Sequence, residues 1–237
     1  GRERAQNIEA ETRRVRARPD LRTPGVRALL DSLTAAGIPL EVVTSGNEDT
    51  TQKTLSGLEL APLFRRLHPG GDKENAVRER LKELGLPAAG AVLIGNDARD
   101  MKAARGAGAL AVGIALDEEH AAPLRAAGAD VVVHGDFSDL GPLRELLTAR
   151  PLPGGPAPGP AAPGPRVEIL RPERVAAADL RLCFFDINGT LWRGYPFETK
   201  AELWSRFLFN DAHPAPERIE EVRRFFIDTD WMNWGEQ

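Results

Sequence analysis

The stretch from residue 24 to 150 alternates short apolar runs with amphipathic segments. Apolar runs bounded by turn residues predict buried strands, and apolar residues that recur every three to four positions predict helices. The expected strands are 38–45, 91–96, 109–115 and 130–135. The expected helices are 24–36, 73–84, 98–106, 118–127 and 139–148. This alternation predicts an α/β fold in which a parallel sheet carries helices on both faces.

The composition narrows the range of partners and compartments. With 237 residues, 42% of them apolar, the chain is long enough for a substantial core in one or two domains. A net charge of -4 without a long basic run disfavours nucleic acid and anionic membranes as partners. The single cysteine, Cys183, excludes an intrachain disulfide and fits a reducing compartment. No apolar run approaches the roughly 20 residues that span a bilayer, and the N-terminus is too polar for a signal peptide, so we expect a cytoplasmic protein.

A segment rich in proline and glycine, PLPGGPAPGPAAPGP, occupies residues 151–165. Such a composition neither forms a strand ladder nor buries a core, so we interpret the segment as a linker. After it we expect one strand, at 181–186, followed by aromatic-rich sequence with helices at 198–209 and 215–227. One strand cannot form a domain, so we expect it to join the sheet of residues 24–150.

Polar side chains follow three of the expected strands, where ligands bind in open parallel sheets. They are Asp186, Asn188 and Thr190 after one strand, Thr44 and Ser45 after another, and Asn96, Asp97 and Asp100 after a third. Lys73 begins the helix that precedes the last of these strands. A carboxylate, hydroxyls, a lysine and a second acidic cluster are suited to an aspartyl nucleophile that acts on a phosphoryl or similar group.

Four motifs resemble those of the haloacid dehalogenase superfamily. FDINGTL, at 185–191, is similar to its first motif, Asp-x-Asp-Gly-Thr-Leu, and EVVTS, at 41–45, to its second. Lys73 suits the third, and LIGNDARDMKAARGAGALAVGI, at 93–114, resembles the fourth. The resemblance implies a Rossmann-like core with a small helical cap, and a Mg²⁺-dependent phosphatase that acts on a small phosphate ester through an aspartyl-phosphate intermediate.

The resemblance also implies roles for the residues at the strand ends. Asp186 would be the nucleophile, and Thr44, or Ser45 after a shift of one residue, would bind oxygens of the transferred group. Lys73 would neutralise the charge of the nucleophile and of the phosphoryl group. The metal ligands would come from the set Asp186, Asn188, Asn96, Asp97 and Asp100.

Two asparagines depart from the family pattern. Asn188 stands where the phosphatases carry an aspartate that exchanges a proton, and loss of such general acid-base help typically costs about 10²- to 10⁴-fold in rate. Asn96 stands at the first acidic position of the fourth motif, where an amide oxygen ligates Mg²⁺ without contributing charge. Purely structural roles also remain open, because Asn188-Gly189 suits a hairpin turn and Asn96 suits a helix N-cap.

The order of the motifs is second, third, fourth, linker, first, which is the pattern that a circular permutation gives. We expect a core formed by 24–150 and completed by 166–191, joined through 151–165, with a helical cap formed by 192–237 and 1–23. A domain-swapped homodimer is the rival to a monomer.

Two other functions fit the same residues. A metal-independent 2-haloacid dehalogenase needs no acid at position 188, so it tolerates both asparagines. A catalytically inactive binding or scaffold protein that keeps the fold is the third possibility.

Overall fold

A computed structural model describes residues 22–138, 147, 166–192, 205 and 215–228. The chain divides into two compact units, one of Arg16–Trp192 and one that combines Gly1–Val15 with Arg193–Gln237. The helices expected at 139–148 and 198–209 lie outside the described residues except for Leu147 and Ser205. In the described part of the chain, no helix is long and apolar enough to cross a membrane. The cytoplasmic location stays a prediction.

The first unit is built on one sheet, whose described strands number seven and lie in the order β2-β1-β7-β3-β4-β5-β6. The strands are β1 Leu40–Val43, β2 Arg66–His68, β3 Ala91–Gly95, β4 Leu110–Ala115, β5 Val131–His134, β6 Arg166–Ile169 and β7 Leu182–Phe185. Neighbouring strands are parallel except β5 and β6, which are antiparallel. The fold is therefore the expected Rossmann-like α/β sheet, with one antiparallel edge strand.

Strand β7 lies in the interior of this sheet although it is the last of the described strands in sequence. Phe184 is in register with Glu41 of β1 on one side and with Leu93 of β3 on the other. Every residue of β7 is buried, so its sequence LCFF is apolar on both faces. Strand β7, which comes after residues 151–165, thus lies between two strands that come before them.

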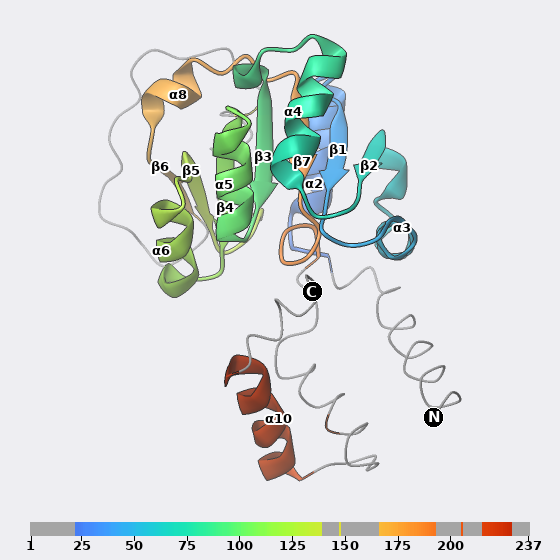
Figure 1. The fold of residues 1–237 in the computed structure, drawn as a ribbon, viewed down its shortest axis with the longest axis vertical. Helices are drawn as coiled ribbons and strands as arrows, with labels where there is room; N and C mark the ends of the chain where they lie inside the picture. Colours follow the sequence, from blue (N-terminus) through green and yellow to red (C-terminus); the bar gives the residue numbers. More distant parts are fainter. Residues whose placement is uncertain (1–21, 139–146, 148–165, 193–204, 206–214, 229–237) are drawn as a thin grey trace. The chain divides into compact units, whose positions relative to one another are not determined.

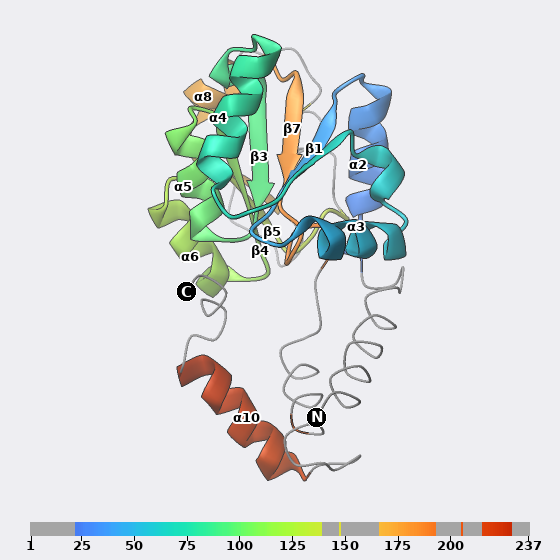
Figure 2. The same ribbon diagram turned by 45° about the vertical axis from the view of Figure 1, so that its right-hand side comes forward.

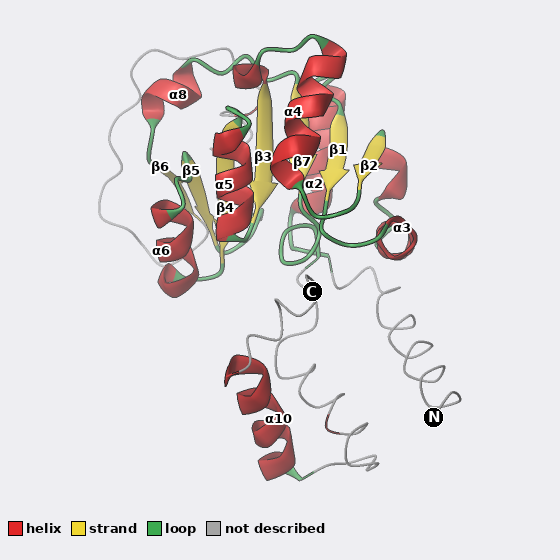
Figure 3. Ribbon diagram, viewed as in Figure 1, coloured by secondary structure: helices red, strands yellow, loops and turns green. Residues whose placement is uncertain are grey.

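Helices cover both faces of the sheet. The helices of this unit are α2 Val26–Ala35, α3 Glu48–Gly57, α4 Lys73–Leu84, α5 Ala98–Gly106, α6 Glu118–Ala126 and α8 Pro172–Ala176. Helices α4 and α5 lie on one face and α2 lies on the other, with the strands as a layer between them (Figures 1, 2 and 3). Apolar residues of α4, α5 and α6 pack with strand residues in one core cluster. In the second unit, helix α10 spans Pro216–Asp228.

Local signals explain the helix that carries Lys73. The side chain of Asp72 caps α4 by accepting a hydrogen bond of 2.9 Å from the backbone of Asn75. Gly85 ends the helix in the left-handed conformation at φ 63°, which glycine adopts without strain. Helix α4 therefore begins and ends where the sequence predicts, at 73 and 84.

The expectation of a single strand after the linker was wrong. Residues 166–169 form β6, whose sequence RVEI has a charged residue at every second position because the strand lies at the edge of the sheet. The sequence also gave no expectation of β2, α3 and α8. Helix α3 reads EDTTQKTLSG and buries only Thr51, Thr54 and Leu55, so its apolar periodicity is weak.

Candidate active site

Three strand ends meet at one edge of the sheet. Strands β1, β7 and β3 are parallel neighbours, so the residues that follow them lie at the same edge (Figure 2). Asp186 follows β7 and donates its backbone N–H to the carbonyl oxygen of Ile94 at 2.9 Å. Thr44 follows β1 and donates its backbone N–H to the carbonyl oxygen of His68 at 3.0 Å. The sheet thereby fixes the backbone at both positions.

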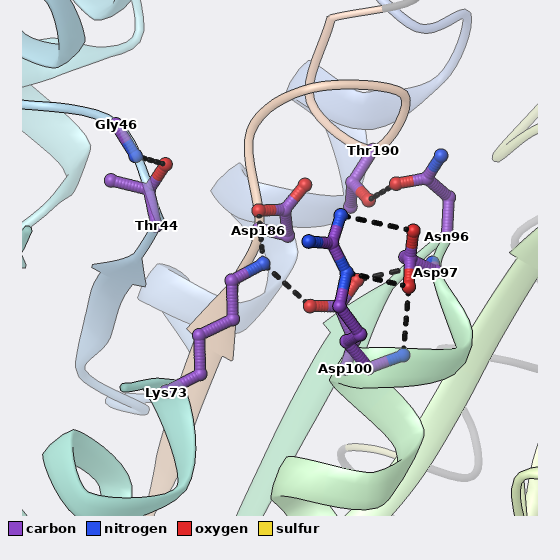
Figure 4. Close-up of polar contacts among 9 residues, drawn as sticks. Thr44, Gly46, Lys73, Asn96, Asp97, Asp100, Asp186 and Thr190 are labelled. Carbon is purple, nitrogen blue, oxygen red and sulfur yellow. Dashed lines mark hydrogen bonds and ion pairs between the residues drawn. The ribbon is translucent and has the colours of Figure 1, made fainter. Parts of the chain in front are cut away.

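A lysine joins two carboxylates at the centre of this edge. The Nζ atom of Lys73 donates to Oδ1 of Asp186 at 2.7 Å and to Oδ1 of Asp100 at 2.6 Å (Figure 4). The exposed fraction of the side chain is 13% for Lys73, 8% for Asp186 and 0% for Asp100. Because all three groups are largely removed from water, their electrostatic interactions are stronger than those of surface ion pairs.

The charges around them change the pKa values of Asp186 and Lys73. Burial and the negative charge of Asp100 raise the pKa of Asp186 from 3.8 to about 6, against the opposing effect of Lys73. Burial by itself would lower the pKa of Lys73, but the charges of Asp186 and Asp100 outweigh it, so that pKa is raised. The lysine is therefore a permanent cation, and the site holds one more carboxylate than it has cations.

Asp100 is held in place by the start of helix α5. Its Oδ2 atom accepts a hydrogen bond of 3.1 Å from the backbone N–H of Asp97, which leaves Oδ1 for Lys73. A Cβ atom at position 95 would lie 2.3 Å from Oδ2 of Asp100. Gly95 is therefore required for this close approach of the strand to the carboxylate.

Asp97 has a different partner. Its Oδ1 atom accepts a hydrogen bond of 2.7 Å from the backbone N–H of Arg99 and lies 3.2 Å from that residue's Nε atom. Burial would raise the pKa of Asp97, but these hydrogen bonds outweigh it, so the pKa is lowered. Asp97 thus caps α5 and pairs with Arg99, apart from the carboxylates that Lys73 joins.

Asn96 packs against the turn that follows Asp186. Its Oδ1 atom accepts a hydrogen bond of 3.5 Å from the hydroxyl of Thr190, which is fully buried (Figure 4). Gly189 has φ 83°, and a Cβ atom there would lie 2.2 Å from Nδ2 of Asn96. Asn188, one residue earlier, is exposed. The Asn-Gly pair therefore forms a tight turn beside the fourth motif, with the side chain of Asn188 on the surface.

Thr44 and Ser45 differ in burial. Thr44 is 2% exposed, and its Oγ1 atom accepts a hydrogen bond of 3.1 Å from the backbone N–H of Gly46. Ser45 is exposed. The hydroxyl proton of Thr44 stays available as a donor, because the bond to Gly46 uses only an acceptor site of that oxygen.

The donor set at this edge fits Mg²⁺ through two carboxylates. The described residues contain no group of three or more His, Cys, Asp or Glu side chains suited to a metal ion. Magnesium is usually bound by only one or two protein carboxylates, with water and phosphate oxygens as the other ligands. Asp186 and Asp100 supply two such carboxylates. They lie close to each other because both contact Lys73.

A buried charged cluster beneath the site was not expected from the sequence. Glu41 of β1 is fully buried and accepts hydrogen bonds from Nη2 of Arg80 at 2.7 Å and from Nε at 2.9 Å. The Nε2 atom of His68 lies 2.6 Å from its other oxygen. The signal was present, since a glutamate within the apolar run IPLEVV needs a charged partner. The cluster joins β1, β2 and α4. Thr44 directly follows β1, and Lys73 is the first residue of α4.

Part of the chain is similar to known proteins. Residues 9–114 match the family model described as haloacid dehalogenase-like hydrolase. Over 104 residues the chain is 38% identical to a phosphoglycolate phosphatase of Neisseria meningitidis, covering 41% of this chain and 43% of that protein. It is 36% identical over 104 residues to the phosphoglycolate phosphatase of Neisseria gonorrhoeae, covering 41% and 42% of the two chains. A solved structure of a conserved haloacid dehalogenase-like protein from Agrobacterium tumefaciens has a TM-score of 0.45 at 21% identity, over 51% of this chain and 59% of that one.

The family match contains part of the site. It includes Thr44, Lys73 and Asp100, whereas Asp186 lies beyond its end. The chain spans 43% of the length of the first of the curated relatives that it matches. Residues 9–114, which are less than half of the chain, are thus similar to the haloacid dehalogenase-like hydrolases, and the sheet is mostly parallel as that similarity leads one to expect.

Proposed function

We propose that the chain is a Mg²⁺-dependent phosphatase that hydrolyses a small phosphate ester, with Asp186 as the nucleophile. The observation that carries this proposal is the lysine that joins two buried carboxylates, Asp186 and Asp100, at the end of the central strand. A carboxylate at this place attacks phosphorus, and an ammonium group beside it offsets the negative charge that gathers there.

The reaction divides into two displacements. In the first, an oxygen of Asp186 bonds to phosphorus as the ester P–O bond breaks, and the leaving oxygen takes a proton from water or a side chain. In the second, a water molecule attacks phosphorus, the bond to Asp186 breaks, and inorganic phosphate leaves. Lys73 stays charged throughout, because the pKa of its ammonium group is raised.

Thr44 and Lys73 are the proposed phosphate-binding groups. The hydroxyl of Thr44 would donate to a phosphoryl oxygen, and Lys73 would balance its charge as a point cation. The exposed Ser45 is the weaker candidate for the same contact. The relatives named above are phosphoglycolate phosphatases, so phosphoglycolate is the first substrate to test.

Asp186, Asp100 and the backbone carbonyl of Asn188 are the proposed holders of Mg²⁺, with the amide oxygen of Asn96 as a further ligand. The bound ion would supply positive charge to the phosphoryl oxygens. We leave Asp97 out of this set because its carboxylate caps α5 and pairs with Arg99. The protein itself would contribute two adjacent carboxylates, those of Asp186 and Asp100, and only one lysine cation to balance their two negative charges.

The test compares Asp186→Asn with Asp179→Asn, an exposed aspartate of the same post-linker segment that pairs with Arg181. Release of phosphate from phosphoglycolate and p-nitrophenyl phosphate is measured with Mg²⁺ and with EDTA. We expect the parent and Asp179→Asn to turn over only with Mg²⁺, and Asp186→Asn to be inactive. Turnover that survives both Asp186→Asn and EDTA would contradict the proposal.

The same assays distinguish the proposed phosphatase from the two other functions that are compatible with Asn188 and Asn96, a dehalogenase and an inactive binding protein. Release of chloride from a 2-haloacid without Mg²⁺ would indicate a dehalogenase, since that chemistry needs no acid at position 188. No turnover of either substrate class, together with no thermal stabilisation by Mg²⁺, would indicate an inactive binding protein.

The motif order supports a circular permutation as part of this proposal. Three motif positions precede the linker and Asp186 follows it, yet β7 pairs with β1 and β3. We propose that 24–150 and 166–191 form one core joined by 151–165, and that 192–237 with 1–23 forms the cap.

A further inference from the structure

A buried aspartate outside the candidate active site attracts three arginines. Asp130, just before β5, is fully buried, and its Oδ2 atom accepts a hydrogen bond of 2.8 Å from the backbone N–H of Ala111. Its Oδ1 atom lies 3.0 Å from Nε of Arg174, 3.4 Å from Nη1 of Arg171 and 3.5 Å from Nη1 of Arg105. Two of these arginines come from the segment after the linker, so one buried charge connects the two parts of the chain.

The same two arginines also bind backbone carbonyls. Arg171 donates from Nη1 to the carbonyl oxygens of Gly128 and Ala129 at 2.6 and 2.8 Å, just after α6 ends. Arg174 donates from Nη2 to the carbonyl oxygen of Ala109 at 2.7 Å, just after α5 ends. These carbonyl groups belong to the short connections from α6 to β5 and from α5 to β4. Each guanidinium therefore contacts both the carboxylate of Asp130 and backbone carbonyl oxygens of these connections.

Backbone hydrogen bonds fix the position of the segment. The N–H groups of Leu170 and Arg171 donate to the carbonyl oxygen of Asp130 at 2.8 and 3.2 Å. Strand β6 pairs with β5 in one register, with Val133 opposite Val167. These contacts fix the register of β6 and the positions of Leu170 and Arg171. The chain that leads on to β7 therefore starts from a fixed point.

We propose that residues 166–192 form a docking segment whose binding surface is Asp130 with the ends of α5 and α6. The segment docks onto its own chain and delivers Asp186 to Lys73. On this proposal the contacts around Asp130 place the segment, and the covalent connection through 151–165 is not needed once the chain has folded. The inference concerns assembly, so it stands whatever reaction the site catalyses.

The test cuts the connection in the folded chain of 237 residues. A protease recognition sequence is inserted between Gly155 and Pro156, and the purified protein is cleaved without denaturation. Because Gly1–Val15 and Arg193–Gln237 belong to one compact unit, the two pieces would stay together even without the docking segment. The readout is therefore amide hydrogen exchange of peptides from 166–192, measured before and after the cut.

We expect the cut parent protein to protect β6 and β7 as the uncut protein does. In the cut Arg171→Ala/Arg174→Ala variant we expect exchange of these strands to be at least about tenfold faster, because the segment then undocks more often. Arg181→Ala is the matched control, since Arg181 is in the same segment but pairs at the surface with Asp179. Its cut form should exchange as the cut parent does.

Three outcomes would overturn the proposal. Fast exchange of 166–192 in the cut parent would show that the tether is needed, and this measurement requires no variant to fold. Equal exchange in the cut double variant and the cut parent would show that the arginines do not hold the segment. The third outcome is a difference in mass between the uncut proteins. If the parent has the mass of a dimer and the Arg171→Ala/Arg174→Ala variant has the mass of a monomer, the segment docks onto a second copy.

Discussion

Lys73 is the residue on which the candidate site depends most directly. Replacing it in Lys73→Met leaves Asp186 and Asp100 buried side by side without a cation. Removing one partner of a buried ion pair typically costs about 3 to 5 kcal/mol of folding free energy. We expect a loss of that size in urea unfolding, with phosphatase activity lower by about 10² to 10³. Lys102→Met is the control, because Lys102 is exposed on α5 and should leave both measurements unchanged.

The raised pKa of Asp186 gives a pH dependence of stability with a definite sign. The folded pKa is about 6 and the ordinary value is 3.8, so the folded state binds more protons between these values. The free energy of unfolding should therefore fall as pH rises through this window and level off above it, by up to about 3 kcal/mol in total. Urea unfolding of metal-free protein measures this, and Asp186→Asn should lack the slope. A parent protein that becomes more stable, relative to Asp186→Asn, between pH 4 and 6 would contradict the assignment.

Asn188 offers a gain of function. The residue is exposed, so Asn188→Asp changes the chemistry at this position with little demand on packing. An aspartate there can protonate the leaving oxygen and then deprotonate water, and such help is worth about 10²- to 10⁴-fold in rate. We expect kcat for phosphoglycolate to rise within that range. Asn47→Asp, at the exposed N-cap of α3, adds the same charge elsewhere and should not raise kcat.

At the scale of elements, a cluster of charges holds the strand of Thr44 to the helix of Lys73. Glu41→Gln removes the charge that Arg80 and His68 share, and the loss of a buried partner should lower the free energy of unfolding by about 3 kcal/mol. Glu83→Gln is the control, since Glu83 also pairs with Arg80 but is largely exposed. If both variants unfold at the same urea concentration, the cluster does not stabilise the junction of β1 and α4.

Elements could be predicted from the sequence where their pattern is local. Helix α4 has caps and periodicity within its own residues, and β3 is a continuous apolar run, so both were expected at nearly their observed positions. Strand β6 was missed because RVEI is only four residues long and alternates charged with apolar residues, and its pairing with β5 is decided by contacts distant in sequence. In the candidate site, too, local patterns could be predicted from the sequence and contacts between side chains could not. Motif spacing indicated Asp186, Lys73 and Asp100, but the separate pairing of Asp97 with Arg99 is a matter of side-chain geometry that spacing does not contain.

At the scale of the whole molecule, the site is assembled from two stretches separated by the linker. Thr44, Lys73 and Asp100 come from before it and Asp186 from after it. A chain of this kind can close on itself or exchange the later stretch with a second copy, and both give the same local contacts. The form that we expect is the closed one, in which β7 pairs with β1 and β3 of its own chain.

Mixing two inactive variants distinguishes the two forms. Lys73→Met is defective before the linker and Asp186→Asn after it, so every site is defective in a mixture of closed chains. In a swapped dimer of one variant with the other, one site collects both defects and the other collects neither. Random pairing after joint unfolding and refolding would then restore about a quarter of the sites. We expect no activity above that of the separate variants, and phosphate release near a quarter of the parent's rate would show that the segment is exchanged.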